Sequence, residues 1–406
     1  MGWFREIPPT AGFPFDWKEA LSIFKTSHSQ ETIENDFRNY LDVEYAKVTC
    51  SGTAALYLIL ETLKKLSPRK MVIIPSFVCP LVPLAIKRAG FNVEICDINK
   101  GDFNFNLLEL EKLCLKNPDI LAIIVVHLGG LPLDLDPIKK ISEQYGIFLI
   151  EDCAQSLGAT YRDKKVGTVG DFSFFSLCRG KGLTIYEGGV IVTSKKDYVG
   201  QVEETIGRLV RDDFILEWLR IFELFGYGLF YRPHLFWFVF KLPQMFWNLQ
   251  GKRFRAFMEY FTIDFPIHHV SRVRKQIGHV HFHRLEEEIK RQREKASYYI
   301  EGLRDLEGVQ VVKAPEYGWG NYPYLTLIFD TPEKREMVFK RFENSGLGIS
   351  QIYACAITDY DYLKPILPDR SFPNARYLAE REITLSTSTF LKKEDLDSVL
   401  AILKAP

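Results

Sequence analysis

In the first half of the chain, short apolar runs are separated by longer stretches in which apolar and polar residues are mixed. Seven short apolar runs have the length of buried strands, at residues 45–49, 70–75, 92–97, 120–126, 147–150, 172–177 and 190–193. Three longer stretches carry the spacing of amphipathic helices, at residues 30–41, 54–66 and 134–145. Strands that alternate with helices make βαβ units, so we expect an α/β fold whose mostly parallel central sheet is flanked by helices.

The pattern changes after residue 270. A long, highly charged helix is expected over 271–306, and it contains His279, His281 and His283. Their spacing does not put all three on one helix face, so we expect a polar helix surface there and no metal site. Shorter strands and helices are expected after it, at residues 309–312, 324–329, 333–344, 348–352 and 394–404. Together these elements predict a smaller C-terminal α+β domain.

The segment at 195–270 is long and aromatic, and a small basic cluster at 251–255 lies within it. No run in it reaches the roughly 20 apolar residues that a membrane-spanning helix needs. Three interpretations stay open: extra helices packed on the body or on a partner subunit, a membrane-interfacial segment with aromatic rings in the headgroup layer, or a lid over the substrate site. The chain is therefore expected to form a large domain, an aromatic-rich insert and a small domain, at residues 1–194, 195–270 and 271–406.

Composition narrows the class of protein. The 406 residues include 52 Lys and Arg and 52 Asp and Glu, so the formal net charge is zero. A nucleic-acid-binding surface would appear as net or clustered positive charge, so no nucleic-acid partner is expected. The seven cysteines form no CxxC pair, which argues against a disulfide framework or a structural zinc site. Because the first residues also lack the apolar core of a signal peptide, we expect a reducing, cytoplasmic location.

Side chains suited to catalysis are concentrated at residues 151–189. An apolar run ends there in Glu151 and Asp152, and ligands of open α/β sheets sit at the carboxyl ends of strands. Lys181 follows, between two glycines. Pyridoxal 5'-phosphate (PLP) requires such a pair, because the lysine forms its Schiff base and the carboxylate keeps its pyridinium nitrogen protonated. Taken singly, Asp152 could instead be a turn residue and Lys181 a solvated loop residue.

This stretch resembles the signature of the DegT/DnrJ/StrS family of nucleotide-sugar aminotransferases. Residues 151–155 (EDCAQ) are similar to the family's E-D-x-A-Q, residues 175–181 (FSLCRGK) to F-S-F-x-x-x-K, and residues 184–189 (TIYEGG) to T-x-x-E-G-G. The resemblance implies specific contacts with PLP: Lys181 as the Schiff-base lysine, Asp152 on the pyridinium nitrogen, Gln155 near the ring hydroxyl and Ser176 on the phosphate.

A Ser-Gly-Thr turn, Ser51–Thr53, opens the helix expected from residue 54. Its free N–H groups, hydroxyls and helix dipole make an anion site, although an ordinary N-cap has the same sequence. The family carries a similar Gly-Thr, which implies that Gly52 and Thr53 contact the cofactor phosphate. His127, in a segment similar to the family's V-H-x-x-G, either contacts substrate or completes a turn.

Two regions depart from the family's pattern. Cys79 stands where the family commonly has an aromatic residue that stacks on the pyridine ring of PLP. Phe77, two residues earlier, either provides the stacking side chain or belongs to the core. In the family an Asn and an Arg from the neighbouring subunit complete the site. Their matching positions here are Ile267 and His269, so the candidate replacements are His268, His269 and Arg272.

The resemblance also implies a fold and an activity. The fold is the PLP-dependent transferase fold type I, aspartate-aminotransferase-like, in a homodimer. The activity is that of a PLP-dependent sugar aminotransferase, which uses an amino-acid donor, expected to be glutamate, to aminate a nucleotide-activated keto-deoxysugar for surface polysaccharide or glycoconjugate biosynthesis. Two rivals remain: a PLP-dependent sugar dehydratase, for which relatives carry His in place of Lys181, and a non-catalytic binding or regulatory protein on the same scaffold. If the insert is interfacial, the protein would be peripheral to a membrane.

Overall fold

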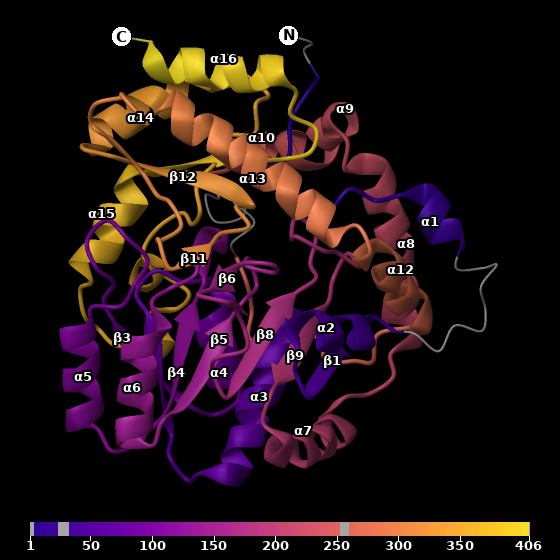
Figure 1. Cartoon of the computed structure of the whole chain (residues 1–406), viewed down its shortest axis with the longest axis vertical. Helices are drawn as coiled ribbons and strands as arrows, with labels where there is room; N and C mark the ends of the chain where they lie inside the picture. Colours follow the sequence, from indigo (N-terminus) through magenta and orange to yellow (C-terminus); the bar gives the residue numbers. More distant parts are fainter. Residues whose placement is uncertain (1–3, 23–31, 252–259, 406) are drawn as a thin grey trace.

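The computed structural model describes residues 4–22, 32–251 and 260–405. A seven-stranded sheet forms the centre of the large domain, in the order β1-β9-β8-β5-β4-β2-β3 (Figure 1). Its strands are β1 (Tyr45–Thr49), β2 (Met71–Pro75), β3 (Asn92–Cys96), β4 (Ile120–Val126), β5 (Phe148–Asp152), β8 (Phe172–Ser176) and β9 (Gly189–Thr193). Within this sheet only β9 runs antiparallel to its neighbours, so the expected mostly parallel sheet is confirmed.

Helices flank this sheet because its central strands are apolar on both faces. All seven residues of β4 are buried, as expected for a strand covered from both sides. The flanking helices are α2 (Ile33–Leu41), α3 (Gly52–Leu66), α4 (Leu81–Arg88), α5 (Leu107–Lys116), α6 (Leu135–Tyr145) and α7 (Lys196–Leu209). The α/β class predicted from the sequence pattern is therefore confirmed.

A smaller domain lies above the large one in Figure 1. Its antiparallel sheet has the order β10-β12-β13, with strands β10 (Val309–Val311), β12 (Tyr324–Phe329) and β13 (Glu382–Ser386). Its helices are α13 (Leu285–Gly302), α14 (Pro332–Arg341), α15 (Pro373–Arg381) and α16 (Lys393–Lys404). The N-terminal segment also packs here: Ile7 belongs to the core of this domain, and Arg5 pairs with Asp395 at 2.7 Å.

A short third sheet connects the two domains. Its order is β11-β6-β7, with β6 (Thr160–Tyr161) and β7 (Lys164–Lys165) from the large domain and β11 (Gly318–Trp319) from the C-terminal part. The remaining short helices are α1 (Trp17–Ser22), η1 (Leu128–Gly130), η3 (Ile357–Asp359) and η4 (Lys364–Ile366).

Two elements differ from the sequence-based expectation. The helix expected over 271–306 is two helices, α12 (Arg272–Phe282) and α13, because α12 packs on α1 and α2 whereas α13 packs on the small domain. The strand expected at 348–352 does not form, and only a single bridge joins Ser350 to Thr384.

The expected polar surface for the three histidines is wrong for two of them. His279 is buried, with its Nδ1 2.6 Å from Oδ2 of Asp36. His281 is fully buried between the rings of Phe13 and Phe15, and this burial, with the charge of Arg284, lowers its pKa to about 4. Only His283 is exposed.

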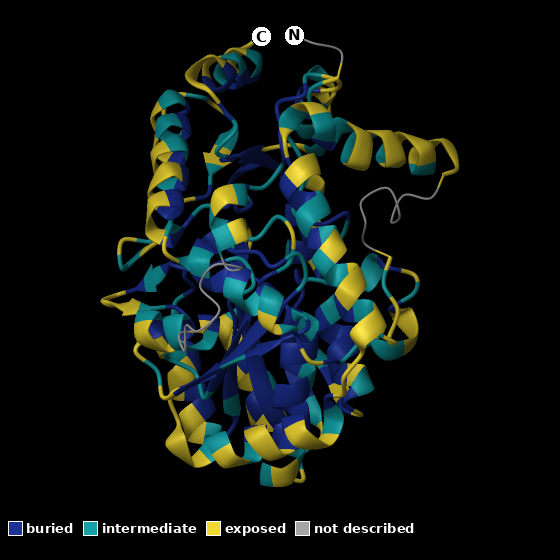
Figure 2. Cartoon of the chain, turned by 90° about the vertical axis from the view of Figure 1, so that its right-hand side faces the viewer, coloured by how far each residue is buried: buried dark blue, intermediate teal, exposed yellow. Residues whose placement is uncertain are grey.

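Within the segment 195–270, α7 packs on the large domain, and the aromatic part that follows forms a series of helices. These are α8 (Phe214–Phe230), α9 (Pro233–Phe236), the π-helical turn η2 (Trp237–Lys241) and α10 (Leu242–Leu249). Figure 2 shows the last of them projecting from the body, toward the grey trace on the right. Among the described residues, no helix has both the length and the apolar character needed to cross a bilayer. The basic cluster predicted at 251–255 lies almost wholly outside the described residues.

Candidate active site

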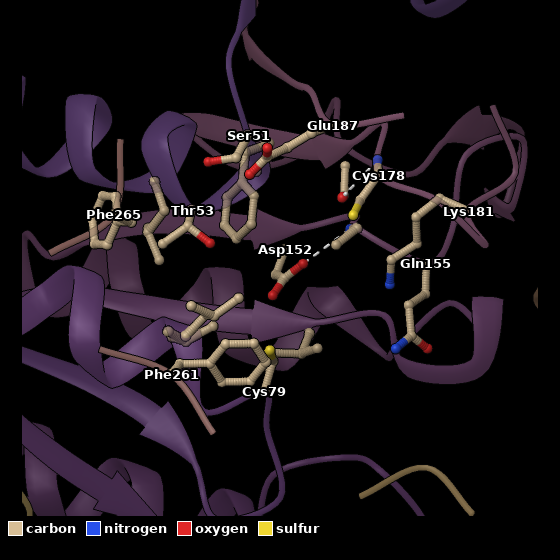
Figure 3. Close-up of a pocket in the computed structure, with 18 of the residues that line it drawn as sticks. Ser51, Thr53, Cys79, Asp152, Gln155, Cys178, Lys181, Glu187, Phe261 and Phe265 are labelled. Carbon is tan, nitrogen blue, oxygen red and sulfur yellow. Dashed lines mark hydrogen bonds between the residues drawn. The ribbon is translucent and has the colours of Figure 1, made fainter. Parts of the chain in front are cut away.

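A cavity of about 480 Å³ opens at the carboxyl ends of β4, β5 and β8. This is the edge where ligands of parallel α/β sheets bind. Six of the seven residues expected to contact the cofactor line it, namely Gly52, Thr53, Asp152, Gln155, Ser176 and Lys181 (Figure 3). The fold thus brings together residues that are up to 129 positions apart, from Gly52 to Lys181.

Asp152 ends β5 on the wall of the cavity and is 4 % exposed. Its Oδ1 accepts the backbone N–H of Ala154 at 2.9 Å. Burial raises the pKa of Asp152 to about 6, although the charges of Lys181 and His127 act in the opposite direction. The protonated ring nitrogen of PLP would place a further positive charge beside this buried carboxylate and favour its ionised form.

Gln155 presents a fixed amide to the cavity. Its Oε1 accepts the backbone N–H of Gly129 at 2.9 Å and the hydroxyl of Tyr324 at 2.5 Å. Since both donors reach the oxygen, the amide nitrogen is left to donate elsewhere. That donor suits an anionic oxygen such as the ring hydroxyl oxygen of PLP.

The first turn of α3 and the end of β8 form a second part of the wall. Ser51 is the N-cap of α3, and its hydroxyl accepts the N–H of Ala54 at 3.0 Å. A Cβ on Gly52 would lie 3.3 Å from Cβ of Ser176, so the two elements approach closely. Free N–H groups of a helix start, with the hydroxyls of Thr53 and Ser176 beside them, suit a phosphate.

Lys181 reaches the cavity from a loop that other residues hold in shape (Figure 3). Thr184 closes this loop, because its hydroxyl donates to the carbonyl of Leu177 at 3.1 Å and accepts the N–H of Tyr186 at 3.0 Å. Thr10 donates to the carbonyl of Gly180 at 2.8 Å. The lysine therefore stands on a positioned turn rather than on a freely solvated one.

Phe77 is the expected residue that does not line the cavity. It is 2 % exposed, and its ring packs edge-on against Tyr353 at 5.2 Å. This placement fits the core alternative for Phe77. Cys79 lines the cavity instead, and so does Phe261. Sequence reasoning missed Phe261, since nothing local connects it with Cys79.

Phe261 belongs to residues 260–266, which we call the strap and which line the cavity at six positions. The strap is held at both ends. Tyr260 packs on Tyr362 at 5.3 Å, and the guanidinium of Arg88 lies 4.2 Å from the ring centre of Phe265. Cys50 donates its thiol to the carbonyl of Pro266 at 3.2 Å.

Beneath the cavity, His127 and Glu151 form a fully buried pair with 3.0 Å between Nε2 and Oε2. Nδ1 of His127 accepts the N–H of Leu133, so Nε2 carries the proton. Burial opposes the ionisation of Glu151, but His127 and the amides of Gly170 and Gly167 outweigh it and lower its pKa.

The turn interpretation of His127 thus has structural support, although its ring also lines the cavity. His127, Glu151 and Cys153 lie close enough together to suggest a metal site. Both carboxylate oxygens already accept backbone N–H groups from residues 167–170, however, so this cluster acts as a structural brace.

A second buried network ties α8 of the insert to the cavity wall. Arg274 is fully buried and donates to the carbonyls of Ile185 and Glu187 and to the carboxylate of Glu217. Burial opposes the charge on Glu217, but hydrogen bonds from His268 and Arg274 outweigh it and lower its pKa to about 2. Arg220, also on α8, lies 2.5 Å from Glu187, whose side chain lines the cavity.

The candidate replacements for the family's Asn and Arg do not line this cavity. His268 pairs with Glu217 at 3.1 Å, and the backbone N–H of His269 donates to the carbonyl of Arg211 at 2.9 Å. Arg272 is exposed. Whether any of the three reaches the cavity of a neighbouring subunit stays a prediction.

Comparison with known proteins identifies the family of the chain. The chain matches the DegT/DnrJ/EryC1/StrS aminotransferase family over residues 19–205 and 269–404. The gap between the two matched parts covers most of the aromatic insert.

Two relatives and one solved structure illustrate the match. An uncharacterized protein of Methanocaldococcus jannaschii, MJ1066, is 26% identical over 375 residues, which is 91% of this chain and 88% of the relative. GDP-perosamine synthase of Caulobacter vibrioides is 34% identical over 169 residues, 42% of this chain and 45% of the relative. The PLP form of a putative sugar aminotransferase, Spr1654 of Streptococcus pneumoniae, matches with a TM-score of 0.74 and 19% identity, covering 98% of each chain.

The family match spans most of the chain, and the solved structure shares its fold. The cavity offers a lysine, a buried carboxylate, an amide donor and a phosphate cradle, which together fit PLP. The chain belongs to the DegT/DnrJ/EryC1/StrS aminotransferase family, whose members are PLP-dependent enzymes.

Proposed function

We propose that this enzyme transfers an amino group from glutamate to the keto group of a nucleotide-activated deoxysugar, for surface polysaccharide or glycoconjugate biosynthesis. The observation that carries the proposal is the amine of Lys181 in one cavity with Asp152 and Gln155. The sugar nucleotide is supported by the name of the Caulobacter relative, GDP-perosamine synthase.

When bound, PLP supplies an electron sink that lets an amino group leave one carbon and join another. In the proposed arrangement Asp152 stays ionised and pairs with the ring nitrogen, while the amide of Gln155 donates to the ring hydroxyl oxygen. Gly52, Thr53 and Ser176 hold the phosphate. Lys181 holds the cofactor through its amine and, once released, carries a proton to and from the substrate carbon.

The two faces of the ring would have different neighbours. Ala154, two residues after Asp152, also lines the cavity and is small enough to approach one face. Cys79 and Phe261 would cover the other face, so that a ring from the strap replaces the aromatic residue that is absent at position 79. The strap would also exclude water from the reacting atoms, which strengthens the electrostatic contacts there.

A homodimer is part of the same proposal. The outward face of α8 is apolar, with Phe214, Ile215, Trp218, Leu219 and Phe222 all exposed. Its inward face carries the buried Glu217. Leu224 and Tyr227 of the same helix are buried against the body, so the exposed apolar side chains form a second apolar face that another subunit can cover. We further propose that the insert brings the enzyme to a membrane surface.

Absorbance spectroscopy of the purified protein tests the catalytic proposal. Wild type with PLP should show the near-visible band of lysine-bound cofactor, and glutamate should shift it. Lys181→Ala should lose both the band and the shift. Lys164→Ala, which removes an exposed lysine of β7, is the matched control and should behave as wild type.

Two other outcomes of this experiment would contradict the aminotransferase proposal. A stable band that no amino acid shifts would favour a dehydratase, although the presence of Lys181 rather than His argues against one. Failure to bind PLP at all would leave the non-catalytic binding protein as the better description.

A further inference from the structure

Residues 233–250, which we call the arm, form a helical rod of α9, η2 and α10 (Figure 2). No residue of η2 or α10 is buried. The exposed side chains are nevertheless large and apolar: Phe238, Val239, Leu242, Met245, Phe246 and Leu249. Monomeric proteins rarely leave such a contiguous apolar surface in water, so the arm is built to meet another apolar phase.

The arm carries positive charge only. No Asp or Glu occurs from residue 224 to residue 258, whereas Arg232 and Lys241 lie at the base and in the middle of the arm. Glu6 hydrogen-bonds the base of the arm through its backbone N–H to Pro233, but it is buried; burial raises the pKa of its carboxyl, although the charge of Lys241 acts in the opposite direction. An anionic surface would therefore approach the arm without meeting an exposed carboxylate on it.

The shape of the arm distinguishes between a lipid layer and a protein partner. A protein surface covers one face of a helix, as it would for α8, whereas no residue of η2 or α10 is buried, and their exposed apolar side chains are spread from Phe238 to Leu249. Its apolar part, residues 235–249, would extend about 22 Å as a helix, which is short of the roughly 30 Å hydrocarbon core of a bilayer. Trp237 and Trp247 are residues that favour the headgroup boundary.

We propose that the arm inserts into the interfacial layer of a bilayer with anionic headgroups, with Arg232 and Lys241 against the lipid phosphates. This identifies the part of the insert that makes the membrane contact proposed above. The strap at 260–266, which lines the cavity, follows the arm in the chain after residues 251–259.

Vesicle co-sedimentation of the PLP-loaded enzyme tests the proposal. The probes are phosphatidylcholine vesicles, with and without phosphatidylglycerol. Wild type should bind the anionic vesicles more tightly. The double variant Phe246→Ser/Leu249→Ser, which changes side chains that are 54 % and 88 % exposed, should lower the fraction bound at least tenfold. Leu108→Ser/Leu115→Ser on α5, with 72 % and 69 % exposure, is the matched control and should bind as wild type.

Substitutions serve better than a deletion of residues 214–261, because that deletion would also remove Glu217 and leave Arg274 buried without its partner. The PLP absorbance of each variant reports on folding and on the catalytic proposal separately from binding. The proposal is overturned if wild type ignores both kinds of vesicle, or if the arm variant binds as wild type does. It is also overturned if, in sedimentation equilibrium without lipid, the arm variant has a lower molecular mass than wild type. That result would mean that the arm packs against a second copy of the chain.

Discussion

At the residue scale, Asp152 shows how the site works against the stability of the fold. Its pKa is raised from 3.8 to about 6 by burial, so the protein without cofactor becomes less stable as the pH rises through this range. Below pH 3.8 the carboxyl is protonated in both folded and unfolded states and the effect is absent. In the proposed function this cost is offset when the cationic ring nitrogen of the cofactor pairs with the ionised carboxylate.

Asp152→Asn should therefore stabilise the cofactor-free protein by about 1–3 kcal/mol at pH 7. The difference should vanish below about pH 4, where the wild-type carboxyl is already neutral. Urea unfolding at both pH values measures it. The same variant should bind PLP more weakly at pH 7, which absorbance titration checks. Equal stability of the two apo proteins at pH 7 would contradict the raised pKa.

Glu217 affects stability in the opposite direction from Asp152, because its ionised form stabilises the fold. Its pKa is lowered to about 2, so it stabilises the fold above its ordinary pKa of 4.5, and this stabilisation is lost as the pH falls from 4.5 toward 2. Glu217→Gln should cost about 3–5 kcal/mol at pH 7, because the charge of Arg274 stays buried without a counter-ion. The cost should shrink at pH 3 in the same unfolding experiment. Glu204→Gln, at an exposed ion pair with Lys65, should leave the unfolding curve unchanged.

At the element scale, the E-G-G segment at residues 187–189 is a packing feature as much as a chemical one. A Cβ on Gly189 would lie 2.4 Å from the carbonyl oxygen of Ser51 and 2.5 Å from the nitrogen of Gly52. The start of β9 therefore touches the turn proposed to hold the phosphate, and only glycine allows this approach.

Gly189→Ala should push that turn out of place, so PLP affinity should fall at least tenfold while much of the fold survives. Fluorescence titration with PLP measures the affinity, and circular dichroism confirms the fold. Gly200→Ala on α7 is the control: its new Cβ meets nothing within 4 Å, so the variant should bind PLP normally and gain up to about 1 kcal/mol of stability. Normal PLP binding by Gly189→Ala would show that the turn does not hold the phosphate.

At the scale of the whole molecule, the outward face of α8 predicts a dimer. Trp218 and Phe222 are 72 % and 75 % exposed on it. Sedimentation equilibrium without lipid should give twice the chain mass of 47.0 kDa for wild type. Trp218→Ser/Phe222→Ser should shift the protein toward monomer, and Leu108→Ser/Leu115→Ser should not. A monomeric wild type would contradict the dimer prediction, and the exposed face of α8 would then have to bind another partner.

The sequence by itself determined the alternation of strands and helices and the α/β class, and it predicted Asp152, Gln155, Ser176 and Lys181 as site residues, which all line one cavity. Each rests on local information: periodicity within one element, or a motif within 31 residues from Glu151 to Lys181. The length and aromatic composition of residues 195–270 also marked the insert as a departure from the family's common pattern. They left three interpretations of the insert open.

Only the tertiary structure decided which distant residues meet. Phe261 lines the same cavity as Cys79 although 182 positions separate them, and Glu217 pairs with Arg274 at a separation of 57 residues. The same holds for His281, whose burial depends on Phe13 and Phe15 and not on its own helix. Such contacts arise when helices dock on one another, and docking depends on complementary shape and charge, which no local periodicity encodes.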